Sequence, residues 1–474
     1  MLLAQATDAA GDISRTSTPL VNLAYVLASA MFIYGLKQLS HPRTAVRGNL
    51  IAAAGMLLAI TVTLLNRGII GFNFIIAGLI IGGVIGGIIA LRVRMTAMPE
   101  LVGMLNGFGG VASLLVASAE FLNAANPGRE FLGSVYAAGI IGSVTFFGSL
   151  IAAAKLKEIK WLPRGGLFRG QQFVNAILIL IALGCAAWGT WDADMAWTFW
   201  PAIALAAVIG VLVVTPIGGA DMPVVICLLN SYSGLAAAAT GFVLNNNGLI
   251  IAGSLVGSSG IILTRIMCRA MNRSLAHVLF GTMGPTAGSA TADEVYGGRV
   301  KSTSADEVAM LFDTARRVVI VPGYGLAVAQ AQHAVRDLTN LLESRGVEVE
   351  FGIHPVAGRM PGHMNVLLAE ANIPYDQIRD LDDINPTFEQ TDVAIVIGAN
   401  DVVNPAARTD PASPIAGMPI LDVDKARTCI VIKRSLSPGF AGIPNPLFAA
   451  DRTLMFFGDG KKAVLDLITA VKES

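Results

Sequence analysis

Nine apolar segments of roughly membrane-crossing length fill the first 270 residues of this 474-residue chain. They lie near residues 19–39, 48–66, 69–91, 99–122, 131–154, 172–190, 197–215, 223–244 and 248–268. A helix needs about 20 apolar residues to cross a lipid bilayer, and charged residues fall mostly between these segments. Buried helices of a soluble core do not account for so many long apolar runs. The sequence therefore predicts a polytopic α-helical membrane bundle of about nine transmembrane helices.

Composition supports this prediction and excludes two other classes of protein. Mean hydropathy is +0.64 and charged residues make up 14% of the chain, against about 25% in ordinary soluble domains. Lys and Arg number 33, as do Asp and Glu, so the net basic charge expected of a nucleic-acid-binding protein is missing. The four cysteines are scattered and form no Cys-x-x-Cys pair, so we predict neither a metal site nor a disulfide framework.

Basic residues gather in alternate loops between the apolar segments, at 37–47, 92–94 and 155–169 and after the ninth segment. The intervening loops carry only Arg67 and Arg129 as basic residues. Loops rich in Lys and Arg stay on the cytoplasmic side of a membrane. We therefore expect the N-terminus outside and the C-terminal part of the chain in the cytoplasm.

Few polar side chains lie within the apolar segments, and polar groups at membrane depth suggest function because they are costly there. Asn106, Ser149 and Asn230 lie inside predicted spans, and Asp221 lies at the mouth of the eighth. One interpretation is hydrogen bonding that holds helices together, and the other is a polar path for protons. All five histidines lie outside the predicted spans, so this chain supplies no histidine to such a path.

The chain changes character near residue 273 and from there has the pattern of an α/β domain. Short strands rich in β-branched residues are predicted at 318–322, 347–354, 394–398, 429–433 and 454–458. A helical pattern follows the first strand to about Glu343, and a last helix runs to Val471. This alternation predicts a doubly wound, Rossmann-like parallel sheet, with its ligand at the carboxyl ends of the strands.

Two motifs in this part of the chain indicate the ligand. The glycine turn from Gly323 to Ala329 follows the first strand, where glycines let the backbone approach a pyrophosphate. An ordinary strand-to-helix turn is the alternative, since the motif ends in Ala. Lys433-Arg434-Ser435 ends a later strand and offers cations to a 2′-phosphate, and no acid follows the second strand. The sequence thus favours NADP(H) over NAD(H), with a solvated basic turn as the alternative.

The chain divides into three parts by these patterns. Residues 1–270 are predicted to form the transmembrane domain, and residues 313–474 the cytoplasmic nucleotide-binding domain. Residues 271–312 contain scattered Gly, Ser and Thr and are predicted to form a linker or hinge between them.

Several longer motifs can be compared with known families. They are Gly219-Ala-Asp-Met-Pro, Leu229-Asn-Ser-Tyr-Ser-Gly, His354-Pro-Val-Ala-Gly-Arg-Met-Pro-Gly-His, Gly398-Ala-Asn-Asp and Lys433-Arg-Ser. Over nearly the whole chain they resemble the β subunit of bacterial proton-translocating, Re/Si-specific NAD(P)⁺ transhydrogenase. The resemblance implies that an NAD(H)-binding α subunit with its own membrane helices passes a hydride from NADH to NADP⁺ on this chain. It further implies that inward proton movement drives the reaction, in the bacterial inner membrane and in a homodimer of the αβ unit.

The resemblance also implies roles for individual residues. Asn400 and Asp401 would lie at the nicotinamide end of the nucleotide, with Asp401 linking protonation to nucleotide release, and residues 439–442 would form a lid. Asn106, Ser149, Asp221 and Asn230 would line the proton path. The complete set of expected nucleotide contacts is Gly323, Tyr324, Gly325, Leu326, Ala327, Val328, Ala329, Val356, Ala357, Gly358, Arg359, Met360, Pro361, Gly398, Ala399, Asn400, Asp401, Val402, Asn404, Lys433, Arg434, Ser435, Gly439, Phe440, Ala441, Gly442, Gly458 and Asp459.

Two residues depart from the family's commonest pattern. Phe440 stands where the lid often has Tyr, so a hydroxyl contact is lost there. Asn106 stands where the enteric type has a membrane His, so we expect a partner chain to supply that histidine. Direct hydride transfer requires no acid–base catalyst from this chain.

Two other functions are compatible with parts of the pattern. A transporter or channel gated by a cytosolic NADP-sensing domain would also combine a helical bundle with a nucleotide fold, but would show a polar site at the bilayer midplane. A self-contained NADP-linked reductase would need a second redox site, and no second nucleotide motif, flavin site or Cys/His cluster is present in the sequence.

Overall fold

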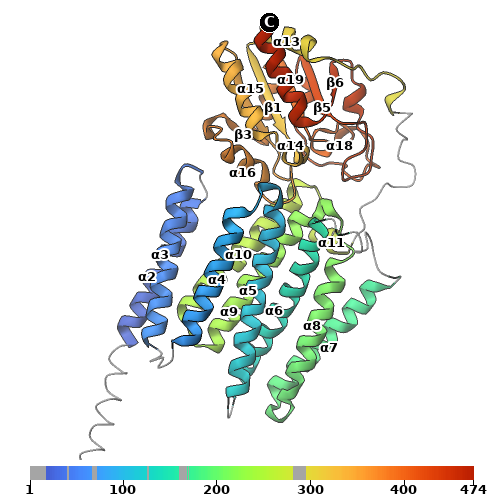
Figure 1. The fold of residues 1–474 in the computed structure, drawn as a ribbon. Coiled ribbons are helices and arrows are strands. Elements are labelled where there is room, and N and C mark those ends of the chain that lie inside the picture. The colour runs from blue at the N-terminus through green and yellow to red at the C-terminus, as the bar shows by residue number, and fades with distance from the viewer. Residues whose placement is uncertain are drawn as a thin grey trace, which may run out of the picture.

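The computed structural model describes residues 18–39, 42–66, 72–124, 127–157, 159, 168, 170–280 and 295–474. These residues form a bundle of long helices and an α/β domain that lies over one end of the bundle (Figure 1). The predicted loop residues Arg67, Lys160, Arg164 and Arg169, and residues 281–294 of the predicted linker, lie outside the described residues.

In the described part of the chain, nine helices are long and apolar enough to cross a membrane. They are α2 (Thr18–Leu39), α3 (Pro42–Asn66), α4 (Asn73–Arg92), α5 (Met98–Asn123), α6 (Arg129–Leu156), α7 (Gln171–Trp191), α8 (Phe199–Val214, whose candidate span begins at Ala193), α9 (Met222–Val243) and α10 (Asn247–Ala270). The 3₁₀ turns η1 (Met95–Ala97), η2 (Ala193–Thr198) and η3 (Gly219–Asp221) precede α5, α8 and α9, and the short α11 (Leu275–Phe280) follows α10. The predicted membrane bundle is confirmed.

Small residues bring the central helices of the bundle close together. The helix α6 contacts α5, α8 and α9, and α9 in turn packs along α10. A Cβ built on Gly253 of α10 would lie 2.4 Å from the main-chain nitrogen of Ala238 in α9. Any larger residue at Gly253 would push these two helices apart, because the atom that it meets is backbone.

The α/β domain contains one parallel sheet in the order β3-β2-β1-β4-β5-β6. Its strands are β1 (Arg317–Pro322), β2 (Glu348–Ile353), β3 (Ile378–Asp380), β4 (Val393–Ile397), β5 (Thr428–Lys433) and β6 (Thr453–Phe457). This is the strand order of the dinucleotide-binding fold, in which the order reverses between β1 and β4. The predicted doubly wound parallel sheet is confirmed.

The two faces of the sheet carry separate apolar cores. Helices cover one face, where residues such as Val318 and Ile320 of β1 pack against Leu338 and Leu467. These helices are α13 (Ala305–Thr314), α14 (Tyr324–Ala329), α15 (Gln332–Ser344), α16 (His363–Glu370) and α19 (Gly460–Glu473). Shorter elements cover the other face: α17 (Leu381–Ile384), η5 (Asn385–Gln390), η6 (Asp401–Val403), η7 (Val423–Lys425) and η8 (Pro446–Ala449). The 3₁₀ turn η4 (Tyr375–Gln377) leads into β3, and α18 (Ala406–Thr409) belongs to a separate small apolar cluster.

Two details of the predicted domain are wrong. The helix expected from the glycine turn to about Glu343 is interrupted, because Gln330 has a left-handed backbone conformation with φ 49° that separates α14 from α15. The strand β3 was not predicted, since it has only three residues and two of them are polar and exposed. Neither difference moves the carboxyl ends of β1, β4 and β5, where the predicted ligand site lies.

Part of the predicted linker is folded against the α/β domain. Tyr296 is buried in the apolar core on the sheet face that the shorter elements cover. Ser302 forms a parallel bridge with Met455 of β6. The side chain of Ser304 and the carboxylate of Glu307 form a reciprocal capping box at the start of α13. The extent of the hinge stays a prediction.

Candidate functional site

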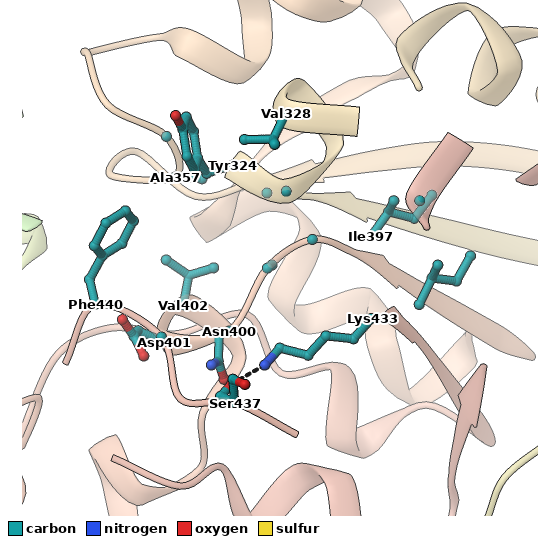
Figure 2. A pocket seen from close by; sticks show the side chains of 18 of the residues that line it. Tyr324, Val328, Ala357, Ile397, Asn400, Asp401, Val402, Lys433, Ser437 and Phe440 are labelled. Carbon is teal, nitrogen blue, oxygen red and sulfur yellow. Dashed lines mark hydrogen bonds between the residues drawn. The ribbon is translucent and has the colours of Figure 1, made fainter. Parts of the chain in front are cut away.

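A cavity of about 640 Å³ opens at the carboxyl ends of β1, β4 and β5. That volume is in the range of small-molecule and cofactor sites. The glycine turn and the start of α14 form one wall, and the residues after β4 and β5 form the opposite wall (Figure 2). The cavity thus lies where the strand order reverses, which is where open α/β sheets bind ligands.

Backbone segments approach one another closely at the floor of this cavity. Gly398 has φ +68°, and a Cβ built on it would lie 2.4 Å from the Cα of Gly325. A Cβ built on Gly323 would likewise lie 2.4 Å from the Cα of Ala399. The N–H of Gly325 donates to the carbonyl of Gly398 at 2.9 Å, which ties the two turns together. The absence of side chains leaves main-chain atoms of both turns facing the cavity.

The basic end of β5 forms the next part of the wall. Lys433, Arg434 and Ser435 all line the cavity. The ammonium of Lys433 donates to the carbonyl of Ser437, and burial lowers the pKa of this lysine. Arg434 is exposed and forms no ion pair within the described residues, so its guanidinium is available to an anion. This arrangement suits a phosphate group.

Asp401 contacts the predicted lid loop, residues 439–442, beside the cavity. Its carboxylate accepts from the N–H of Ala441 at 3.0 Å, and a Cβ on Gly439 would lie 2.4 Å from its Oδ1. Burial raises the pKa of the Asp401 carboxyl, although the N–H groups of Phe440 and Ala441 and the charge of Lys433 oppose the rise. The carboxyl is therefore easier to protonate than an exposed aspartate.

The cavity also faces the membrane bundle. Arg359 donates to the carbonyl of Leu156, the last residue of α6, at 2.7 Å, and its guanidinium lies 4.3 Å from the ring centre of Tyr324. Asn272 donates to the carbonyl of Ala416 at 2.9 Å. The ring of Phe440 lies 3.7 Å from a Cβ built on Gly219 in η3. The wall of the cavity and the bundle are thus in direct contact.

Most residues expected to contact a nucleotide line the cavity, and a minority do not. Those that line it are Gly323, Tyr324, Gly325, Val328, Ala329, Val356, Ala357, Gly358, Gly398, Ala399, Asn400, Asp401, Val402, Lys433, Arg434, Ser435, Gly439, Phe440, Gly458 and Asp459. Those that lie behind or beside it are Leu326, Ala327, Arg359, Met360, Pro361, Asn404, Ala441 and Gly442. Leu326 and Ala327 are fully buried in the helix-covered core instead.

The sequence reasoning missed several residues of the site. Met271, Ser437 and Pro438 line the cavity, and the buried Asn445 and Tyr296 form hydrogen bonds behind it. Ser437 and Pro438 continue directly from the predicted basic triplet, so extending that motif would have found them. Asn445 lies shortly after the predicted lid loop, residues 439–442, so extending that loop would have found it. Met271 and Tyr296 are distant in sequence from every nucleotide motif, and no sequence signal connects them to the cavity.

The polar residues predicted for the membrane bundle lie on its central helices. Asn106 of α5 donates to the carbonyl of Ile226 in α9 at 3.3 Å, and Asn230 lies one turn further along α9. Ser149 of α6 is fully buried, and its hydroxyl has no hydrogen-bond partner among the described residues. Arg273 donates to both carboxylate oxygens of Asp221 at 2.9 Å. Three of the four therefore come from helices in mutual contact, and Asp221 lies at the end nearest the cavity.

His354 should make the α/β domain sensitive to acid. Its Nε2–H donates to the carbonyl of Pro419 at 2.7 Å and its Nδ1 accepts from the N–H of Val356, so the ring is neutral. Burial lowers its pKa to about 4, against about 6.5 when unfolded. The contribution of neutral His354 to the free energy of unfolding is fully present above pH 6.5. About 3 kcal/mol of it is lost as the pH falls towards 4.

Hydrogen exchange of the full chain measures this loss as the opening free energy of β2 at several pH values. His354→Asn should flatten the pH dependence between 4 and 6.5. The exposed His333 serves as the control, because His333→Asn should leave the wild-type slope unchanged. Equal slopes in wild type and His354→Asn would contradict the assignment.

Comparison with known proteins gives a consistent result. The family model for the NAD(P) transhydrogenase beta subunit matches residues 21–470. The chain is 48% identical over 463 residues to the NAD(P) transhydrogenase subunit beta of Rhodospirillum rubrum, covering 94% of this chain and 98% of that protein. The same subunit from a named strain of that species matches to the same extent.

Proposed function

Because the chain belongs to the NAD(P) transhydrogenase beta-subunit family, we propose that it binds NADP(H) in the cavity beside β1, β4 and β5. A partner alpha subunit binds NADH and supplies the hydride, and inward proton movement through the helical bundle drives the transfer. The α/β domain lies in the cytoplasm and the N-terminus on the opposite side, as the basic loops at 37–47 and 92–94 indicate. The working unit is a homodimer of paired subunits in a bacterial inner membrane.

The observation that carries this proposal is the joining of a glycine cradle and a basic strand end in one cavity. The glycines at 323 and 325 let the main chain of the turn approach a pyrophosphate closely, and Lys433, Arg434 and Ser435 bind the 2′-phosphate. Buried polar atoms without partners in the described residues, Nδ2 of Asn400 and Oδ1 of Asp401, mark the nicotinamide end. NADP(H) supplies the hydride chemistry, and this chain's residues bind, orient and shield it.

Asp401 connects protonation to the lid in this proposal. As a carboxylate it accepts from the N–H of Ala441 and holds the lid loop closed. A proton on the carboxyl removes the charge and weakens this charge-assisted bond. Since burial already raises its pKa, a proton arriving from the membrane side would loosen the lid and favour nucleotide release.

Hydride exchange between NADPH and an NAD⁺ analogue tests the proposal in membranes with and without the co-expressed partner subunit. We expect exchange only when the partner is present. No exchange in either case would defeat the proposal and favour a transporter or channel gated by the nucleotide domain. Exchange without any partner would instead favour a self-contained reductase.

Asn106 and Asn230 should be needed for proton movement, because they are amide side chains placed along the contact of α5 with α9. Polar side chains inside a bundle provide stepping points for protons and water. Asn106→Leu and Asn230→Leu should each lower proton pumping in vesicles by about tenfold or more, with NADPH binding retained. Asn175→Leu is the matched control, since Asn175 is also a buried amide but lies on α7. Pumping retained by both test variants would contradict this path.

A further inference from the structure

Asn400 presents an unsatisfied donor to the cavity. It lines the cavity, and its Nδ2 is buried without a hydrogen-bond partner in the described residues. The backbone of Asn400, at φ −141° and ψ −76°, lies outside the helical and extended regions. The turn after β4 therefore sets the direction in which the Asn400 side chain leaves the main chain. A buried amide N–H without an acceptor costs about 1–3 kcal/mol. Such a cost is recovered when a ligand oxygen accepts from it.

Asn445 fixes which end of the Asn400 amide faces the cavity. Oδ1 of Asn445 accepts from the N–H of Leu447 at 3.0 Å, so its Nδ2 must point the other way. That Nδ2 donates to Oδ1 of Asn400 at 3.0 Å and to the main-chain carbonyl of Asn400 at 3.1 Å. Because Oδ1 of Asn400 faces Asn445, Nδ2 of Asn400 is left on the cavity side.

The support for Asn445 is itself rigid. Asn445 is 1% exposed, and its N–H donates to the hydroxyl of Tyr296 at 3.2 Å. The ring of Tyr296 stacks on Phe448, with 6.4 Å between ring centres. Both polar atoms of the Asn445 side chain therefore form hydrogen bonds, and turning the amide over would break them.

We propose that Asn445 is a positioning residue for the nucleotide: it orients the Asn400 amide so that an N–H donor meets an acceptor oxygen of NADP(H). This inference rests on the proposed function. That oxygen must accept a hydrogen bond, because Asn400 has only N–H groups to offer on that side. Asn445 acts through Asn400 and does not itself line the cavity.

Asn445→Asp tests the orientation with almost no change of shape. The new carboxylate oxygen faces Oδ1 of Asn400, so the Asn400 amide turns over and presents an oxygen to the nucleotide. NADPH affinity of the full chain, measured by fluorescence, should fall by about tenfold or more. Asn400→Asp places an oxygen on the cavity side directly and should give a similar loss, whereas Asn400→Ala should give a smaller one.

The double variant separates positioning from a general structural role. If both residues act through one amide, the affinity losses of Asn445→Asp and Asn400→Asp will not multiply when combined. Asn385→Asp is the matched control: its amide is bonded on both sides, to Ile420 and Asp422, but lies outside this cavity. It should lower stability without changing NADPH affinity.

Three outcomes would overturn the proposal: wild-type NADPH affinity in Asn445→Asp, multiplying losses in the double variant, or weaker binding by Asn400→Ala than by Asn400→Asp. The last comparison holds even if Asn445→Asp fails to fold. Failure of the wild-type chain to bind NADPH would count against the proposed function instead. Binding of adenosine 2′,5′-bisphosphate shows which half of NADP(H) carries the oxygen that accepts from Asn400. The affinity of this ligand falls in Asn400→Asp only if that oxygen lies on the adenosine half.

Discussion

Replacing both Lys433 and Arg434 by alanine should weaken NADPH binding by a factor of about 10²–10⁴. Each side chain is placed to donate charge-assisted hydrogen bonds to a phosphate at the end of β5. A hydrogen bond to a charged group contributes about 1.5–3 kcal/mol, and tenfold in affinity corresponds to about 1.4 kcal/mol. Titration of the solubilised chain with NADPH measures the loss.

The control for this double variant is Arg452→Ala. Arg452 is an exposed arginine before β6 and lies outside the cavity, so its loss changes net charge without touching the site. NADH should bind the double variant about as weakly as it binds wild type, because NADH carries no 2′-phosphate. NADPH affinity within threefold of wild type would show that the basic triplet is only a solvated turn.

Gly398→Ala should lower the free energy of unfolding of the α/β domain by about 2–5 kcal/mol. The added Cβ meets backbone atoms, 2.4 Å from both the Cα of Gly325 and the N of Leu326, so the turns after β1 and β4 must separate. Overpacking of this kind costs about 1–3 kcal/mol, and the left-handed backbone adds about 1–2 kcal/mol for a residue with a side chain. NADPH binding should be lost with it, because the same two turns form the floor of the cavity.

Gly346→Ala isolates the backbone contribution to that loss. Gly346 also has a positive φ, +84°, but a Cβ there meets nothing within 4 Å. Its substitution should therefore cost only about 1–2 kcal/mol and leave NADPH binding intact. Hydrogen exchange across β1 and β4 measures both variants in the full chain. Equal losses at the two glycines would show that close approach of the turns does not matter.

Much of this architecture could be predicted because it depends on patterns local in sequence. Apolar runs of membrane length define all nine long helices, and the β-branched runs define five of the six strands. Lys433 and Gly323 could be assigned to one cavity because strand ends of a parallel sheet share an edge. The short β3 and the break at Gln330 depend on tertiary packing, which overrides local preference.

The parts of the site that could not be predicted arise from contacts between distant segments. Asn445 and Asn400 are 45 residues apart in sequence, and nothing in either local sequence indicates that one orients the other. Arg359 follows a predicted strand end, but its guanidinium reaches the end of α6, 203 residues away. Such pairings depend on how distant segments pack together in the folded chain, and the periodicity of the local sequence carries no information about that packing.

Two hydrogen bonds between described residues of the α/β domain and of the bundle are chemically one-sided. In each, a side chain of one part, Arg359 or Asn272, donates to a main-chain carbonyl of the other, that of Leu156 or Ala416. Every amino acid carries that carbonyl, so positions 156 and 416 can vary without removing the acceptor. Substitutions can therefore remove these hydrogen bonds only at the donors. A genetic screen for variants in which the contact between the α/β domain and the bundle is loosened should recover changes at Arg359 and Asn272 far more often than at their acceptors.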